Sequence, residues 1–314
     1  MKSKLSTFIK NQAIEIGFSK VGIAKATSSN KQKENLENWL ENGKHAEMHW
    51  IDKRKEERVN IKNYYPNAKS IISLAMNYNT GKKQEEIKSG FKFSNYAWGD
   101  DYHLVIKNKL RDLLLEIKKF DSKVDGIACV DTSPIMEKYW AQESGLGWQG
   151  KNTNLISRDY GSWLFLGELI LDIELEYDPP FNDDLCGSCV ACIESCPTQA
   201  LSEYQIDARK CISYWSIEHK GDFDNSSNIK LHDWIYGCDI CQEVCPWNIK
   251  FGKITSEACF YPRKEIFEWT KEEWNALDQE SFSYLFKKSS VKRAKYSGVS
   301  RNIKHNLIEK GDSK

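Results

Sequence analysis

Eight of the ten cysteines in this 314-residue chain lie between residues 186 and 245, and their spacing constrains the protein more than any other feature. The first four form a C-x2-C-x2-C-x3-C run that is followed directly by Pro197. A second run, C-x2-C-x3-C, is followed by Pro246. Bacterial ferredoxins bind [4Fe–4S] clusters with this spacing, and the fourth cysteine of a run ligates the other cluster. The spacing therefore predicts two cubane clusters.

The crossing of the fourth cysteines assigns the ligands to two sets. Three cysteines of the first run and the last cysteine of the second run hold one cluster: Cys186, Cys189, Cys192 and Cys245. The other cluster takes an upstream cysteine as its missing member, which gives Cys196, Cys211, Cys238 and Cys241. Zinc knuckles also use C-x2-C pairs, but they do not explain two C-x3-C-P endings. Cys129 and Cys259 lie outside the pattern and are expected to be small core residues.

Charge and export signals narrow the class of protein further. Lys and Arg together number 45, as do Asp and Glu, so a nucleic-acid surface would have to be local. The N-terminus has apolar residues at helical spacing and lacks the apolar core of a signal peptide. No apolar run reaches the roughly 18 residues of a membrane-spanning helix. We therefore expect a cytoplasmic, soluble protein with reduced cysteines and no membrane contact.

The first 178 residues alternate between strand-like and helix-like segments. Short apolar runs predict strands at 21–24, 70–75, 124–130 and 163–171, and periodicity predicts a helix over 102–120. Ser133 before Pro134 predicts a helix start, and that helix should run to about Ser144. Asp131 then lies between a strand end and a helix start, where α/β folds place functional groups. The Asp178-Pro179-Pro180 sequence predicts a boundary, which gives three segments, 1–178, 179–260 and 261–314.

Two further motifs match functional patterns only in part. Residues 145–152 fit both a dinucleotide glycine pattern and a phosphate loop, but they follow a helix and lead into a strand. Both nucleotide interpretations therefore fail. Two interpretations remain: a glycine-rich loop whose backbone can closely approach another group, or a helix C-cap followed by a tight turn. Asp101-Tyr102-His103 is similar to the start of the D-x-H-x-x-G loop of cobalamin enzymes, although Ile106 replaces the glycine. His103 is therefore expected to face a cofactor pocket without binding cobalt, or Asp101 only caps the helix.

Three stretches together resemble one family. Residues 130–157, which include D-T-S-P and G-L-G-W-Q-G-K-N, are similar to the signature segment of epoxyqueuosine reductases. Residues 96–103 and 211–221 resemble the same family, and the likeness runs in order from the first helix to about Ile303. Reductive dehalogenases share the clusters and the cobalamin but not the D-T-S-P segment.

This resemblance implies an α+β protein with a nitroreductase-like α/β domain that holds base-off cobalamin, a ferredoxin-like 2[4Fe–4S] module and a short helical C-terminal tail. It implies reduction of epoxyqueuosine to queuosine at the wobble position of tRNA. Many members continue into a C-terminal helical repeat domain, so the chain resembles a short form. The resemblance also implies a set of residues that contact cobalamin, to which the polar residues of the motifs described above are added. The expected cofactor-binding residues are Arg54, Ser94, Tyr102, His103, Asp131, Lys151, Asn152, Asn154 and Ser157.

The chemistry of such a reaction suggests a role for Asp131. Removing an epoxide oxygen takes two electrons and a proton source, and [4Fe–4S] clusters reach potentials down to about −700 mV. Asp131 is the expected proton donor, with a pKa raised by burial. The electrons would come from an external low-potential donor, and we expect a monomer. A reductive dehalogenase-like enzyme and a non-catalytic electron-transfer protein are the alternatives.

Eight basic residues near the C-terminus form the expected tRNA contact. Tyr296, Val299, Ile303 and Leu307 recur at nearly every fourth position, so the segment can pack as a helix with its basic side chains outward. The alternative is a solvated tail. The basic residues are Lys287, Lys288, Lys292, Arg293, Lys295, Arg301, Lys304 and Lys310.

Overall fold

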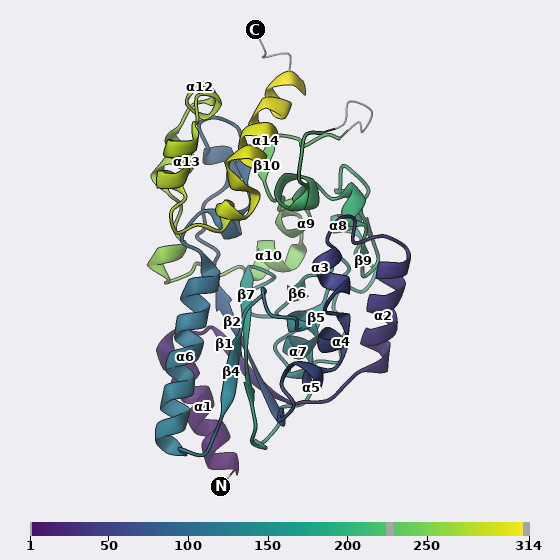
Figure 1. Cartoon of the computed structure of the whole chain (residues 1–314), viewed down its shortest axis with the longest axis vertical. Coiled ribbons are helices and arrows are strands. Elements are labelled where there is room, and N and C mark those ends of the chain that lie inside the picture. Colours follow the sequence, from purple (N-terminus) through teal and green to yellow (C-terminus); the bar gives the residue numbers. More distant parts are fainter. Residues whose placement is uncertain (1, 224–228, 310–314) are drawn as a thin grey trace.

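The computed structural model describes residues 2–223 and 229–309, and an antiparallel sheet of four strands lies at its centre (Figure 1). The strands lie side by side in the order β1 (Lys20–Lys25), β2 (Ser70–Asn77), β7 (Leu164–Leu171) and β4 (Gly126–Cys129). Every residue of β2 and β7 is buried. Because both faces of the sheet are covered, these strands are apolar along most of their length. All four predicted strands are confirmed.

Two helices cover one face of the sheet, α1 (Lys2–Ile16) and α6 (Tyr102–Phe120). The α6 helix has the predicted bounds, and the Asp101 side chain caps it by accepting a hydrogen bond from the His103 backbone N–H. The apolar stripes of the two helices and the inner residues of the strands form the largest core, which includes Leu5, Ile9, Ile106, Leu110, Leu113, Leu169 and Leu171.

The helix α7 (Glu137–Glu143) covers the opposite face of the sheet. It begins at Glu137, so the predicted start at Ser133 is wrong. Residues 131–136 instead form turns, in which the Ser133 N–H and the Thr132 hydroxyl both donate to the Val130 carbonyl. These turns delay the helix and project Asp131 from the end of β4. The predicted stop is confirmed, because Gly145 has a φ of +77° just after the helix.

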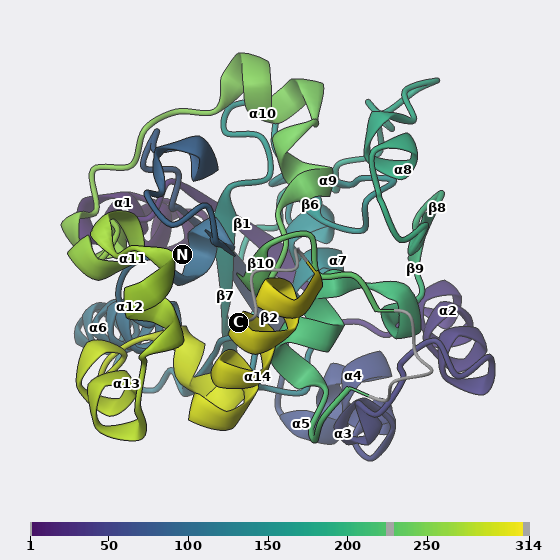
Figure 2. The ribbon, with the colours of Figure 1, turned by 90° about the horizontal axis from the view of Figure 1, so that it is seen from above.

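Short helices surround this sandwich on the α7 side (Figure 2). They are α2 (Asn30–Glu41), α3 (His49–Asp52), α4 (Lys55–Val59) and α5 (Ile61–Tyr64). A hairpin follows α7 and joins β5 (Trp148–Gln149) to β6 (Leu155–Ile156). Among residues 2–223 and 229–309, no helix is long and apolar enough to cross a membrane.

The cysteine-rich part of the chain forms only short elements. They are α8 (Ala191–Glu194), β8 (Leu201–Ser202), β9 (Gln205–Ile206), η3 (Ala208–Lys210), the π-helix η4 (Tyr214–Glu218), β10 (Trp234–Tyr236), α9 (Ile240–Glu243) and α10 (Pro246–Phe251). Little regular structure is possible here because closely spaced turns must present several thiols to one point.

A second large core joins three parts of the sequence. Residues 84–98 provide η1 (Gln84–Glu86), β3 (Lys92–Phe93) and η2 (Asn95–Ala97), and β3 pairs in parallel with β10. They pack against the C-terminal helices α11 (Lys264–Glu268), α12 (Lys271–Asn275), α13 (Gln279–Leu285), η6 (Ser290–Ala294) and α14 (Lys295–Glu309). The preceding short helix η5 (Ala258–Phe260) contributes Phe260 to the first core instead. The second core therefore draws on all three of the segments into which the sequence divides the chain.

The helix α14 buries Val299 and Ile303 in this core, as the periodicity predicts. One basic residue departs from the expected outward orientation. The Arg301 guanidinium turns inward, donates to the carbonyls of Trp215, His219 and Gly221, and lies 4.2 Å from the centre of the Phe223 ring. These carbonyls lie within or just after the π-helix η4 and need hydrogen-bond donors. The Arg301 side chain supplies those donors and therefore does not face solvent. Lys310 lies outside the described residues.

Candidate active site

Asp101, His103 and Asp131 form a chain of hydrogen bonds at one end of the sheet. The His103 Nδ1 lies 2.7 Å from Asp101 Oδ1, and its Nε2 lies 3.0 Å from Asp131 Oδ2. The first turn of α6 supplies the histidine, and the loop after β4 supplies Asp131. One imidazole is thus held between two carboxylates, a geometry that favours the protonated ring.

The electrostatics of this group differ from the sequence expectation. Burial alone would lower the pKa of His103, but its hydrogen bonds to Asp101 and Asp131 outweigh burial and raise it to about 9. Burial also opposes ionisation of Asp131, yet the hydrogen bond and the charge of His103 lower its pKa below the ordinary value. The expected net rise in the pKa of Asp131 is therefore wrong, because the interaction with His103 outweighs the effect of burial. At neutral pH the extra proton of this pair is on the imidazole.

The backbone of Asp131 is unusual for a non-glycine residue, because its φ is +25°. Strained backbone of this kind costs of order 1–3 kcal/mol and gathers at functional sites. The Asp131 side chain is 51 % exposed, while that of His103 is 25 % exposed. The loop therefore presents a reactive carboxyl to an approaching ligand with its histidine partner behind it.

A stack of aromatic rings packs against one face of the His103 imidazole. Tyr102 stacks on the His103 ring at 4.0 Å between centres and on Phe165 at 4.3 Å, with the last two rings nearly parallel. Tyr96 meets Tyr102 edge to face. The stack fixes the imidazole plane, so the direction from its Nε2 to Asp131 is set by the core.

Several charged residues lie near Asp131, and the sequence named one of them, Arg293, only as part of the basic tRNA surface. Arg58 and Arg293 both lie in electrostatic range of its carboxyl, and both guanidinium groups approach the Trp50 ring, at 5.3 and 5.9 Å. Burial and the charge of Asp131 raise the pKa of Glu137 to about 7. Glu137 lies within the D-T-S-P-I-M-E-K sequence, so its position next to Asp131 was the available signal. Arg58 and Arg293 come from distant segments and had no such signal.

The cysteines predicted for the first cluster come together around one cavity. Its volume is about 180 Å³, and Lys151, Asn152, Ile156 and Trp247 also line it alongside Cys186, Cys189, Cys192 and Cys245. The Trp148 indole N–H donates to Cys186 Sγ at 3.5 Å. Within the described part of the chain, no three His, Cys, Asp or Glu side chains converge closely enough to bind a single metal ion. The cavity has the thiol donors of a cubane, so the residues fit this group.

The other four cysteines also lie near one another. Burial raises the pKa of the Cys241 thiol, and nearby Cys211, Asp239, Cys192 and Cys196 raise it further. The Ala200 backbone N–H donates to Cys196 Sγ at 3.3 Å, a contact typical of cluster sulfurs. The closeness of Cys192 to Cys241 means that the two sets adjoin.

The structure places the other predicted cofactor contacts in different surroundings. Arg54 is exposed, pairs with Glu57 and lies 5.4 Å from the Tyr64 ring centre, whereas Arg58 lies near Asp131. The buried Ser94 hydroxyl donates to the Asp239 carboxylate. Both residues are already engaged by the protein.

The remaining four predicted contacts lie in the loop between β5 and β6 or, for Ser157, directly after β6. Lys151 pairs with Glu203 at 2.7 Å, and the Asn152 side chain donates to the Cys241 carbonyl at 3.2 Å. Asn154 Oδ1 accepts from Lys138, and the buried Ser157 hydroxyl accepts from Lys20. This loop therefore connects both cysteine sets to α7.

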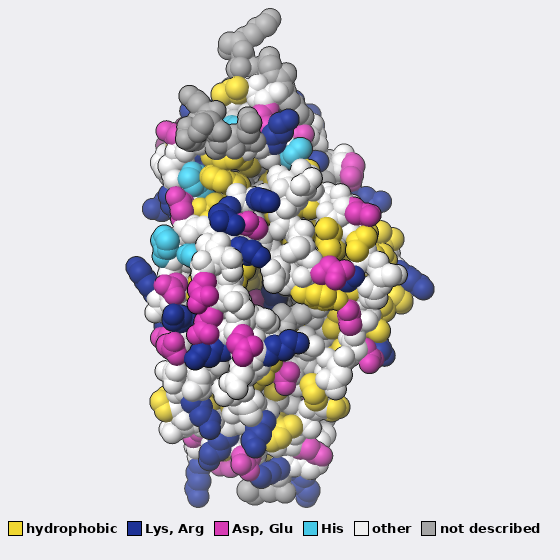
Figure 3. Space-filling model, turned by 90° about the vertical axis from the view of Figure 1, so that its right-hand side faces the viewer, with side chains coloured by type: hydrophobic (Ala, Val, Ile, Leu, Met, Phe, Trp, Pro, Cys, Tyr) yellow, Lys and Arg dark blue, Asp and Glu magenta, His cyan; other side chains and the backbone are white. Residues whose placement is uncertain are grey.

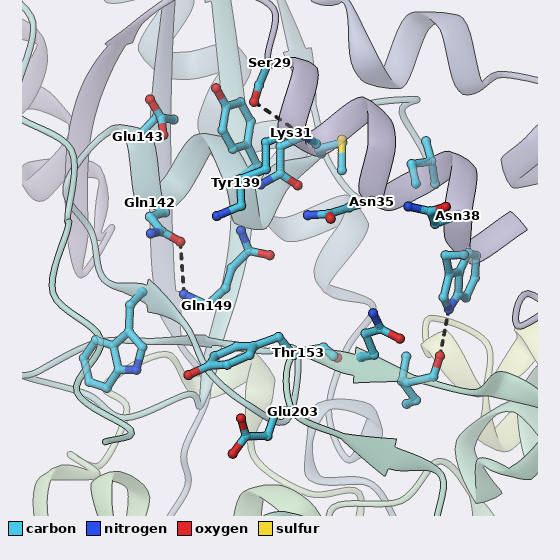
Figure 4. Close-up of a pocket in the computed structure, with 18 of the residues that line it drawn as sticks. Ser29, Lys31, Asn35, Asn38, Tyr139, Gln142, Glu143, Gln149, Thr153 and Glu203 are labelled. Atoms are coloured by element: carbon cyan, nitrogen blue, oxygen red, sulfur yellow. Dashed lines mark hydrogen bonds between the residues drawn. The ribbon is translucent and has the colours of Figure 1, made fainter. Parts of the chain in front are cut away.

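A cavity of about 1070 Å³ lies between α2, α7, the β5–β6 loop and the β8–β9 hairpin (Figure 4). Amide and hydroxyl side chains dominate its wall, with Asn35, Asn38, Gln142, Gln149 and Thr153 pointing inward from different elements. Figure 3 shows this side of the molecule, where acidic and basic side chains are interspersed over most of the surface. The wall also carries charged side chains of both signs, among them Lys31, Glu143 and Glu203, so the cavity suits a large polar ligand that offers many hydrogen-bonding groups.

Two family models match this chain. The one described as epoxyqueuosine reductase QueG, DUF1730 matches residues 58–132, and the 4Fe-4S double cluster binding domain matches residues 185–248. The first range ends just after Asp131, and the second contains all eight predicted ligands. The chain therefore has a [4Fe–4S] double-cluster domain.

Relatives match over nearly the whole chain. The epoxyqueuosine reductase of Cellulophaga algicola is 43 % identical over 303 residues, which cover 96 % of this chain and 98 % of that protein. The enzyme of Leadbetterella byssophila is 44 % identical over 295 residues, covering 94 % and 96 %.

Solved structures agree with these relatives. A selenomethionine-labelled epoxyqueuosine reductase superposes with a TM-score of 0.88 at 28 % identity and covers 99 % of this chain and 83 % of its own. The enzyme from Streptococcus thermophilus has a TM-score of 0.84 at 31 % identity, covering 98 % and 81 %. A reductive dehalogenase reaches a TM-score of only 0.50 at 15 % identity, a distant likeness of fold. With its α+β fold, its double-cluster domain and full-length relatives at about 40 % identity, the chain belongs to the epoxyqueuosine reductase family.

Proposed function

We propose that this protein reduces epoxyqueuosine to queuosine in tRNA and that Asp131 delivers a proton to the departing oxygen. The observation that carries the proposal is the His103–Asp131 pair at a strand end, in a chain with a double-cluster domain. The Bacillus subtilis relative has been solved with a catalytic aspartate loop swung out of the active site. Asp131 also lies in the loop that follows a sheet strand, with its side chain half exposed, which favours the same role here.

The reaction breaks both carbon–oxygen bonds of the epoxide, leaves a carbon–carbon double bond and releases water. It consumes two electrons and two protons. We propose that the protonated His103 first transfers its proton to the ionised Asp131, which then donates the same proton to the leaving oxygen. The short Nε2–Oδ2 distance of 3.0 Å allows this transfer without movement of either element.

Both clusters are proposed to conduct electrons from an external low-potential donor. We assign Cys186, Cys189, Cys192 and Cys245 to one cluster, because these four line one cavity. Cys196, Cys211, Cys238 and Cys241 would hold the other. The loop between β5 and β6 separates the two cluster sites from the cavity beside α7. It is held by the Asn152–Cys241 hydrogen bond and the Lys151–Glu203 ion pair.

Cobalamin is the proposed occupant of the 1070 Å³ cavity. Its corrin ring is fringed by carboxamides, which pair well with the Asn and Gln side chains of the wall. When bound, cobalamin supplies a strongly reducing, nucleophilic metal centre. Met136 and Tyr139 line the cavity and continue directly from the Asp131 loop. We further propose a nitroreductase-like domain over 1–178, a ferredoxin-like module over 179–260, a helical tail over 261–314, and a monomer.

The tRNA is proposed to bind over η6 and the start of α14. Four exposed lysines lie there or in the turn just before η6, and Arg293 of η6 interacts with the charge of Asp131, so this surface borders the active site. A solved relative contains a tRNA-Tyr stem loop modified with epoxyqueuosine. The lysines are Lys287, Lys288, Lys292 and Lys295.

The decisive experiment is a turnover assay. Protein reconstituted anaerobically with iron, sulfide and cobalamin is mixed with a reductant and an anticodon stem loop that carries epoxyqueuosine. We expect queuosine in the digested RNA, and none when cobalamin is omitted. Reduction of a halogenated phenol in place of the stem loop would instead support a dehalogenase, and cluster oxidation with neither product would support simple electron transfer.

A further inference from the structure

Glu168 is a carboxyl buried in the middle of the central strand β7. Its side chain has no exposed surface, and neither carboxyl oxygen has a hydrogen-bond partner among the described residues. Acidic side chains are almost never fully buried unless they are paired. Burial and the nearby charges of Glu137 and Asp131 raise its pKa well above the ordinary value. Glu168 is therefore a neutral acid that holds a proton inside the sheet.

Other buried polar atoms without partners lie on the same side of the sheet. Side chains alternate along a strand, and the neighbours Leu166 and Ile170 pack toward α7, so Glu168 points toward α7 as well. Ser73 lies opposite Glu168 in the strand register, and its hydroxyl has no partner within the described residues. The same holds for the Trp140 indole N–H and the Ser144 hydroxyl on α7 and its C-cap.

Glu137 connects this buried region with the active site. Glu137 stands one helical turn before Trp140 and Ala141, on the face of α7 that packs on the sheet. It interacts with the charges of both Asp131 and Glu168. Cys129 of β4 lies opposite Glu168 in the pairing of β4 with β7. Burial raises the pKa of its thiol to about 12, so the thiol stays protonated and does not take the proton of Glu168. Buried polar atoms of this kind are those that internal waters join in proteins.

We propose that Glu168 is an internal proton store that supplies the second proton of the reaction through Glu137 to Asp131. This inference rests on the proposed function, since epoxide reduction to an alkene and water needs two protons and the His103–Asp131 pair holds only one. A bound stem loop covers Asp131 and excludes solvent from it. The proton then moves from Glu168 to Glu137 and on to Asp131, and each carboxyl recovers its proton from solvent after the product leaves.

Infrared spectroscopy and single-turnover kinetics test the proposal. The variant Glu168→Gln keeps the size and neutrality of the buried acid but removes its proton, and Glu174→Gln is a matched surface control, since Glu174 is exposed and pairs only with Lys2. At neutral pH we expect a component of the protonated-carboxyl band in wild type and in Glu174→Gln that is lost in Glu168→Gln, while the components of Glu137 and Asp239, whose pKa values are raised to about 7, remain. The single-turnover rate should fall at least about tenfold in Glu168→Gln, with cluster content, cobalamin binding and stem-loop affinity unchanged.

Two results would overturn the inference. One is the absence of the Glu168 component in wild type, and the other is a wild-type rate in cluster-loaded Glu168→Gln. If that variant does not fold, Glu137→Gln replaces it, and there the Glu168 component should persist while the rate falls; an unchanged rate refutes the path. The infrared result does not depend on turnover. Wild-type protein that makes no queuosine would refute the proposed function, whereas equal activity in wild type and Glu168→Gln would refute only the proton store.

Discussion

Replacing Asp131 with asparagine should change both the titration of His103 and the rate of turnover. The rise of the His103 pKa from 6.5 to about 9 is equivalent to roughly 3 kcal/mol of preference for the charged ring, at about 1.4 kcal/mol per pKa unit. Two carboxylates produce this rise against the cost of burial. Removing the charge of Asp131 should therefore lower the pKa of His103 by about one unit, while the neighbouring Asp101 maintains the rest.

The sign of the accompanying stability change follows from linkage. The folded-state pKa of His103 lies above its unfolded value, so its contribution is fully present below about pH 6.5 and disappears as the pH rises through about 9. The variant Asp131→Asn should be destabilised relative to wild type at neutral pH, and this difference should vanish at pH values above about 9. Turnover should fall by about 10²–10⁴-fold because the amide cannot donate the proton.

The assay combines nuclear magnetic resonance of histidine-labelled protein with single-turnover kinetics. Asp101→Asn is the matched control, because it also removes a carboxylate from His103 but leaves the Asp131 carboxyl in place, and asparagine still caps α6. Both variants should titrate lower than wild type, but only Asp131→Asn should lose most turnover. A wild-type His103 that titrates near 6.5, or an Asp131→Asn protein that reacts at the wild-type rate, would refute the reasoning.

Two further predictions concern the clusters and the tRNA surface. Anaerobically purified protein should contain about eight irons, and Cys196→Ser and Cys245→Ser should each impair the cluster opposite to their own run; zinc in place of iron, or a single cubane, would contradict this assignment. Affinity for the stem loop should fall with salt, and alanine at four exposed lysines should flatten the log–log slope by about three, at about 0.7–0.9 per phosphate contact. Arg301→Ala should leave the slope intact but lower the thermal midpoint, because it strips the donors from three carbonyls. An unchanged slope in the quadruple variant would place the tRNA elsewhere; its sites are Lys287, Lys288, Lys292 and Lys295.

Local patterns in the sequence predicted the regular elements well. The helix over 102–120 follows from apolar periodicity, since it must bury one stripe of side chains. The four sheet strands follow from short apolar runs, since both faces of the sheet are covered. The start of α7 was predicted three residues too early, because Ser133 and Pro134 are compatible with a cap and a first helical residue in isolation. In the folded protein the Val130 carbonyl captures the Ser133 N–H and the Thr132 hydroxyl. Long-range constraints on Asp131 thus override the local preference.

The cysteine spacing was sufficient to predict the cluster module, because metal ligands must be particular residue types at spacings that a short loop can satisfy. The sequence also brought Asp131 and His103 forward as candidates. The folded protein was needed to show that these two side chains are hydrogen-bonded, that Arg301 turns inward, and that Glu168 lies beside Ser73 beneath α7. The charge state of a carboxyl depends on partners that are distant in the chain, and folding alone brings those partners together.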